Sequence, residues 1–269
     1  MSDVRAREPS RDPSLEEMES AEFVADGFAL SALVNLILVL ADNKYFLGRR
    51  ISEWCPGGPS LESAVAAAAI AQEELGHSRA LYPLLDDMPL AEVPVPLQRG
   101  AERERKYSVS YLEQPLESWP QVVAALALID PALTTMFNAL SESRYDDLRN
   151  RARRVPGEES FHRKYANGRV RDLTRAGGGR QALQAEVDRL LPELLCWFGP
   201  EGERGVEELK REGLLGLDNE GLRQAFLDDV APVLQEGGID LHIGRDGDRW
   251  TYPDLSWDRW NRLQRRLES

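Results

Sequence analysis

The sequence contains little cysteine, with only Cys55 and Cys196 among 269 residues. Two cysteines so far apart cannot form the disulfide framework of a small secreted domain, and a reducing cytoplasm is the location we expect. Excess positive charge is also missing, since the formal net charge is −13. Phosphate binding needs a dense basic surface, so nucleic acid is excluded as the main partner.

Long apolar runs are missing as well. The longest, over 28–41, is interrupted by Ser31 and Asn35 and is too short to span a bilayer, so we expect no membrane segment. Charged residues interrupt the first 20 positions throughout, which excludes a signal-peptide pattern. We interpret residues 1–20 as a flexible lead-in and residues 21–269 as a single domain.

Helical periodicity dominates the remaining sequence, and the alternation typical of strands is almost absent. Residues 86–120 hold five prolines and predict an irregular excursion. Pro131 lies inside the third predicted helix and indicates a kink or a locally opened turn beside Asp130. The long helices are expected over 21–54, 60–85, 121–150 and from Pro156 to the glycines at 177–179, with further helices over 180–197 and 219–235.

Two of the three histidines belong to Glu-x-x-His units, Glu74 with His77 and Glu159 with His162. Residues three apart share one face of a helix, and both units fall on stripes that are otherwise apolar. A buried carboxylate and imidazole are costly without partners, and joint ligation of a metal removes that cost. Two facing units would make a dinuclear metal site. The alternative is an ordinary contact on a solvated face.

Asp130 is the only acid on the apolar stripe of the helix between these units, which makes it a predicted fifth ligand. Its alternative role is to cap the kink at Pro131. Long helices that carry metal-type residues on their inner stripes predict an all-α fold, a ferritin-like four-helix bundle with additional C-terminal helices and an irregular tail.

The first helix should supply a sixth, carboxylate ligand, but the apolar stripe there carries Lys44. Asp42 is the only acid in the middle of this helix. The two residues lie about 200° apart around a helix, so they cannot both point inward.

Several segments resemble the catalytic subunit of the multicomponent phenylacetyl-CoA epoxidase, a ring-oxygenating enzyme of bacterial phenylacetate breakdown. Residues 72–77 and 158–162 are similar to its two metal motifs, and the interval from Asp130 to His162 looks the same. The resemblance covers most of the chain and continues through 59–61, 197–200, 222–226 and the region around Trp257.

The first helix departs from this resemblance. Counted back from Trp54 without a gap, the first carboxylate ligand of the family falls on Lys44. Asp42-Asn43 and residues 47–54 instead resemble the non-catalytic partner subunit of the same complex, which has lost its metal site. The chain therefore mixes the features of two subunits.

The resemblance implies a di-iron oxygenase that activates dioxygen and inserts oxygen into an aromatic or related acyl-CoA. It also implies a separate reductase and a dimer with itself or with a related chain. Two irons are expected, with one metal or manganese as alternatives. The chain could instead be a non-catalytic or single-metal structural subunit, or an oxygenase that acts on a substrate without coenzyme A.

Lys44 and Asp130 are the residues on which catalysis is predicted to depend, and Lys44 has three interpretations. A protonated Lys44 would pair with a ligand carboxylate and weaken or replace one metal. A neutral or carbamylated Lys44 would restore an oxygen ligand. An offset of the first helix would make Asp42 the ligand. The first interpretation is the one we favour.

Overall fold

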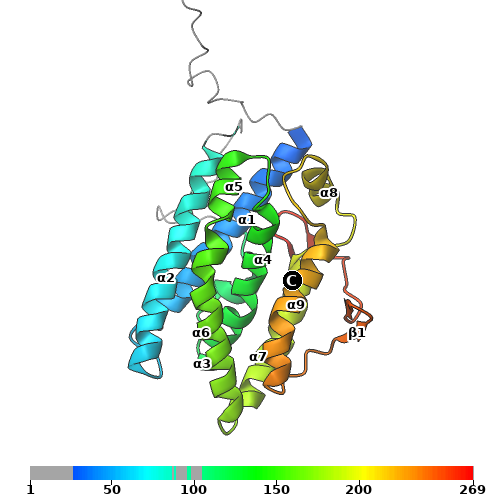
Figure 1. The fold of residues 1–269 in the computed structure, drawn as a ribbon. Helices are drawn as coiled ribbons and strands as arrows, with labels where there is room; N and C mark the ends of the chain where they lie inside the picture. Colours follow the sequence, from blue (N-terminus) through cyan, green and yellow to red (C-terminus); the bar gives the residue numbers. More distant parts are fainter. Residues whose placement is uncertain (1–26, 87, 89–95, 98–104, 269) are drawn as a thin grey trace, which may run out of the picture.

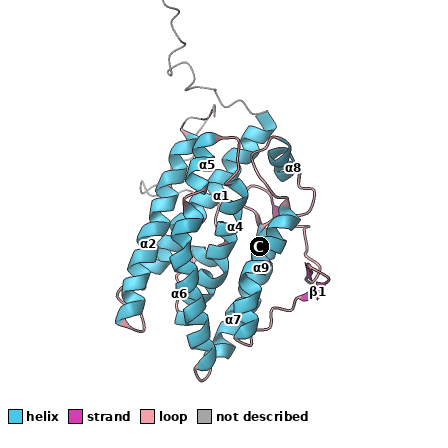
Figure 2. Ribbon diagram, viewed as in Figure 1, coloured by secondary structure: helices cyan, strands magenta, loops and turns pink. Residues whose placement is uncertain are grey.

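The computed structural model describes residues 27–86, 88, 96–97 and 105–268. The predicted lead-in, residues 1–20, and the start of the first predicted helix lie outside this part. The described residues form an all-α bundle, apart from two short antiparallel strand pairs, as the sequence predicted (Figure 2).

Four helical units surround the core of the bundle, and α1 packs along α2 over most of its length (Figure 1). The same view places α6 beside α2, while α4 contacts both α1 and α6. Ser60 caps the second unit, because its hydroxyl accepts from the Ser63 amide. The units are α1 (Gly27–Ser52), α2 (Leu61–Leu81) with the 3₁₀ turn η2 (Tyr82–Leu85), the composite third unit, and α6 (Val155–Arg175).

The third helical unit contains a widened, π-helical turn directly before Asp130. It begins as α3 (Trp119–Ala124), continues as a π-helical segment, η5 (Ala125–Ile129), and resumes as α4 (Asp130–Leu140). Pro131 has no N–H for the carbonyl four residues earlier, which explains the opened turn. The predicted opening is confirmed. The predicted continuation to residue 150 is wrong, because the helix ends at Leu140 and a separate helix, α5, follows over Asp146–Ala152.

The C-terminal elements cover one side of the bundle (Figure 1). Two tryptophans anchor the C-terminal tail: Trp260 Nε1 donates to the Cys196 carbonyl, and Trp250 Nε1 donates to Asp228. The tail is thus attached to the helical body. These elements are α7 (Gly179–Trp197), α8 (Arg204–Arg211), α9 (Asn219–Glu236), and the pairs β1 (Gly244–Asp246) with β2 (Arg249–Thr251) and β3 (Trp260–Asn261) with β4 (Arg266–Leu267).

Two helical stretches, 27–52 and 119–140, are long and apolar enough to cross a membrane by length and composition alone. Within the bundle, 67% and 83% of their most apolar windows are buried. Burial of this extent is what core helices show, because their apolar faces pack on protein. The first stretch also carries Lys44 in its interior.

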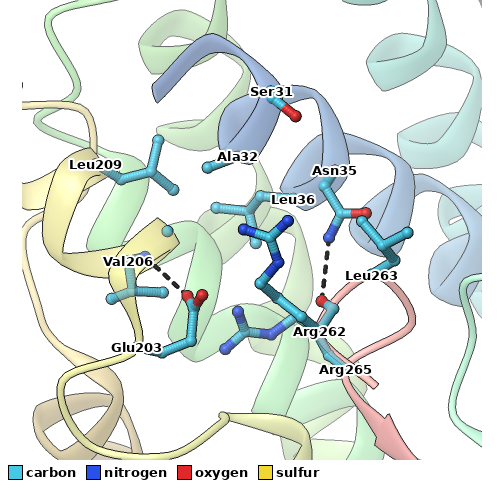
Figure 3. A pocket seen from close by; sticks show the side chains of 11 residues that line it. Ser31, Ala32, Asn35, Leu36, Glu203, Val206, Leu209, Arg262, Leu263 and Arg265 are labelled. Carbon is cyan, nitrogen blue, oxygen red and sulfur yellow. Dashed lines mark hydrogen bonds between the residues drawn. The ribbon is translucent and has the colours of Figure 1, made fainter. Parts of the chain in front are cut away.

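A small pocket lies between α1, α8 and the C-terminal tail (Figure 3). Arg262 and Arg265 extend into it toward Glu203, whose carboxylate accepts from the Val206 amide at 2.9 Å. Asn35 Nδ2 donates to the Arg262 carbonyl at 3.4 Å. The cavity measures about 30 Å³, which leaves room for a few water molecules at most. It is therefore too small for an acyl thioester, and it lies apart from the predicted metal residues.

Gly48 lets α1 approach α2 beside the predicted site. A Cβ at this position would lie 2.9 Å from Leu75 Cγ and 3.0 Å from Glu74 Cβ, closer than side chains normally pack. The absence of a side chain at residue 48 thus brings the two helices together at the level of Glu74.

We expect Gly48→Ala to destabilise the protein by about 1–2 kcal/mol, because overpacking at this contact outweighs the helix-propensity gain of alanine. The matched control is Gly168→Ala on α6, where an added Cβ meets nothing within 4 Å. That change should be neutral or stabilising by up to about 1 kcal/mol. Urea unfolding of both variants checks the contact, and equal stabilisation by both would contradict it.

Candidate functional site

The predicted metal residues converge inside the bundle. Glu74 on α2, Asp130 at the start of α4, and Glu159 and His162 on α6 present ligand-type atoms that all lie within 4.8 Å of one another. His77 adjoins this group, since its Nδ1 lies 3.1 Å from Glu159 Oε1. All five side chains are buried. We call the carboxylates of Glu74, Asp130 and Glu159 the three carboxylates, and these five residues together the centre.

Asp130 points into the centre, away from the backbone of the kink. Its Oδ2 lies 3.3 Å from His162 Nδ1, and its Oδ1 accepts from Lys44 Nζ at 2.8 Å. The capping alternative therefore does not describe this side chain. The opened turn at η5 precedes Asp130 directly, so the local irregularity of the helix lies next to the residue that reaches inward.

The two Glu-x-x-His units support each other reciprocally. His77 Nε2 lies 2.7 Å from Glu158, the residue before Glu159. In the same way, His162 Nε2 lies 2.8 Å from Glu73, the residue before Glu74. Each imidazole thus lies between an inner carboxylate and an outer one from the opposite motif.

The supporting role of Glu73 and Glu158 was missed by the sequence reasoning. The signal was present, because each motif begins with two consecutive glutamates. The first glutamate of each pair reaches the histidine of the other helix. Helical periodicity alone could not show this, because it concerns residues on one helix.

Lys44 occupies the middle of the three carboxylates. Its Nζ donates to Glu159 Oε1 at 2.6 Å, to Asp130 Oδ1 at 2.8 Å and to Glu74 Oε1 at 3.0 Å. The lysine side chain is fully buried, and each carboxylate comes from a different helical unit. Three donated bonds use all three hydrogens of an ammonium, whereas a carbamylated nitrogen has at most one. These contacts favour the protonated interpretation of Lys44.

The electrostatics of the centre agree with this geometry. Burial opposes the charge on Lys44, but attraction to the three carboxylates holds its pKa well above the usual value. Burial and the neighbouring Glu159 charge raise the pKa of Glu74 to about 7, against the effect of Lys44. Burial likewise opposes ionisation of Glu159, but Lys44 and the two histidines keep its pKa well below the usual value. Cations and hydrogen bonds therefore outweigh burial at Glu159 but not at Glu74.

The same contacts act on the histidines. Burial opposes their protonation, but hydrogen bonds to the three carboxylates raise the pKa of His162 to about 12. The nearby Glu159 carboxylate also raises the pKa of His77, again against burial. The inner face of each imidazole thus lies beside a carboxylate.

Asp42 is directed to a different part of the protein. It accepts from the Tyr82 hydroxyl at 2.5 Å and from the Tyr107 amide at 3.0 Å. The neighbouring Asn43 accepts from the Val109 amide at 2.8 Å. Asp42 and Asn43 thus attach residues 107–109 to α1, and the arrangement does not support the offset in which Asp42 would be the sixth ligand.

Comparison with known proteins places the chain in a family. The family described as Phenylacetic acid catabolic protein matches residues 22–252. The chain belongs to this family. Two curated relatives are different subunits of the 1,2-phenylacetyl-CoA epoxidase of Escherichia coli (strain K12). One is 24% identical over 218 residues, 78% of this chain and 70% of the relative. The other is 27% identical over 217 residues, 79% of this chain and 85% of the relative.

The similarity of this family member to both relatives confirms the resemblance seen in the motifs. It also agrees with the mixed character of the first helix.

The donor set is of the kind that holds iron or manganese, since carboxylates and imidazoles converge. Among the described residues, Glu74 Oε2, Glu159 Oε2 and His77 Nδ1 have no aligned hydrogen-bond partner, as is usual for atoms that ligate metals. A dinuclear bundle site, however, takes a carboxylate from each of four helices. Here α1 contributes the Lys44 ammonium to the same three carboxylates. The residues present therefore do not fit two irons.

Proposed function

We propose that this chain belongs to a multicomponent oxygenase of the phenylacetyl-CoA epoxidase type, and that it occupies the place of the structural partner. The observation that carries the proposal is the contact of Lys44 Nζ with all three carboxylates, at 2.6–3.0 Å. Oxygen activation at a metal pair needs these carboxylates as ligands. We therefore assign oxygenation to a related chain with a complete ligand set.

We infer the rest of the complex from the family and the relatives. Its substrate would be an aromatic or related acyl-CoA, and a separate reductase would supply electrons. A dimer of this chain with the oxygenating relative is the assembly we infer, because two different components of one epoxidase both resemble it. The cytoplasmic location stays a prediction.

Reconstitution tests this proposal. The chain is purified alone and together with a family member from the same organism that carries the six-residue ligand set. Each preparation receives ferrous iron, reductase, reductant and phenylacetyl-CoA, and oxygenated thioester is measured by mass spectrometry. We expect no product from this chain alone, a stable heterodimer by light scattering, and product that depends on the relative.

Two outcomes would contradict the proposal. Product from this chain and the reductase alone would make it the oxygenating component. Failure to associate with the relative, together with full activity of the relative in its absence, would remove it from the complex.

A further inference from the structure

We propose that the Lys44 ammonium is a built-in cation that stands in place of the metal pair, and that Lys44→Glu converts the centre into a metal site. The inference deepens the proposed function. It rests on that proposal in one respect, namely that the centre of this chain does not carry out the oxygenation. It concerns the side chains of this chain, so it can be tested without any partner.

The first argument is the match between donors and acceptors. An ammonium has three hydrogens, and each of the three carboxylates lies at a hydrogen-bonding distance of 2.6–3.0 Å from Nζ. The carboxylates come from α2, α4 and α6, while Lys44 comes from α1. The ammonium therefore links all four helical units of the bundle, as a dinuclear metal centre would.

The second argument is burial. Lys44 has no exposed side-chain surface, and the three carboxylates are at most 3% exposed. The ring of Phe137 lies 5.9 Å from Nζ and forms an apolar wall beside it. Carboxylates at such a site are stable only with a counter-charge that is equally buried, and Lys44 supplies one from within the chain.

The third argument is competition. Lys44 contacts Glu74 Oε1, Asp130 Oδ1 and Glu159 Oε1, and an ion in the centre would need oxygens of these same groups. An ammonium a few ångströms from a divalent ion repels it, and the low polarity of the interior strengthens that repulsion. Lys44 and a metal thus exclude each other.

The fourth argument is the position of residue 44. Gly48, one turn further along α1, lets that helix approach α2 at the level of Glu74. A glutamate at 44 would therefore begin from backbone already close to the other ligands. It would add the missing carboxylate to the centre and complete the set of two Glu-x-x-His units and two further carboxylates.

The test is metal stoichiometry in wild type, Lys44→Glu, Lys44→Gln and a matched control. Each metal-free protein is incubated anaerobically with ferrous iron, desalted, and analysed by plasma emission spectroscopy. The control is Lys164→Glu, which makes the same charge change at an exposed position on α6. We expect no stoichiometric iron in wild type or in the control, and about two irons per chain in Lys44→Glu.

Lys44→Gln keeps the test decisive if the glutamate variant does not fold. It removes the charge at similar length, and we expect it to bind at least one iron per chain. The inference is overturned by two irons in wild type, or by folded variants at residue 44 that bind no more iron than wild type. Because no partner is present, these outcomes are distinct from a failure of the chain to join an oxygenase.

Discussion

Replacing Lys44 with methionine is expected to destabilise the protein by about 3–5 kcal/mol, because it leaves three buried carboxylates without their shared cation. Wild-type Lys44 donates to all three at 2.6–3.0 Å, with no exposed surface. Urea unfolding followed by circular dichroism measures the loss. The deficit should shrink as the pH is lowered, since protonation of the carboxylates removes the unpaired charge.

The matched control for this change is Lys164→Met, at the exposed site on α6. Surface substitutions of this kind stay within about 0.5 kcal/mol of wild type. A loss below about 1 kcal/mol for the Lys44 variant would mean that the ammonium does not hold the centre together, contrary to our account.

Replacing Asp42 with alanine is expected to cost about 2–4 kcal/mol without altering metal binding. Asp42 is fully buried and accepts from the Tyr82 hydroxyl and from the Tyr107 amide. Hydrogen bonds to a charged group contribute about 1.5–3 kcal/mol each, and their buried donors would lose this acceptor. Thermal and urea unfolding measure the loss, and hydrogen exchange should increase at residue 107.

The control for Asp42 is Asp146→Ala at the start of α5, where the carboxylate is 75% exposed. This change should cost less than about 1 kcal/mol, because exposed ion pairs contribute little. A parallel iron titration of the Asp42 variant distinguishes the two roles of the residue. A change in metal stoichiometry would restore Asp42 as a candidate ligand.

The inward side of each site helix was predictable from the sequence because it depends on local periodicity. A Glu-x-x-His unit on an apolar stripe must face the core, and the same reasoning placed Lys44 inward on α1. Pro131 likewise predicted the opened turn before Asp130, since a proline removes a particular backbone donor.

The remaining features depend on contacts between residues distant in the chain. Glu73 reaches His162 across the interface between α2 and α6, and Asp42 meets Tyr107 from a segment 65 residues away. Periodicity contains no information about either pair. The predicted extent of the third helix, to residue 150, was wrong for a related reason. The apolar spacing continues past Leu140, but the chain turns there, and the Arg144 amide donates to the Gly213 carbonyl.

The central claim is that Lys44, and no metal, occupies the space between the three carboxylates. Anomalous scattering at the iron and manganese edges tests it most directly, using crystals of the wild-type chain grown with both metals. We predict no anomalous peak in the centre and density for an unmodified Lys44 whose Nζ lies within about 3 Å of all three carboxylates. Two peaks there, with Lys44 carbamylated or turned away, would contradict the account.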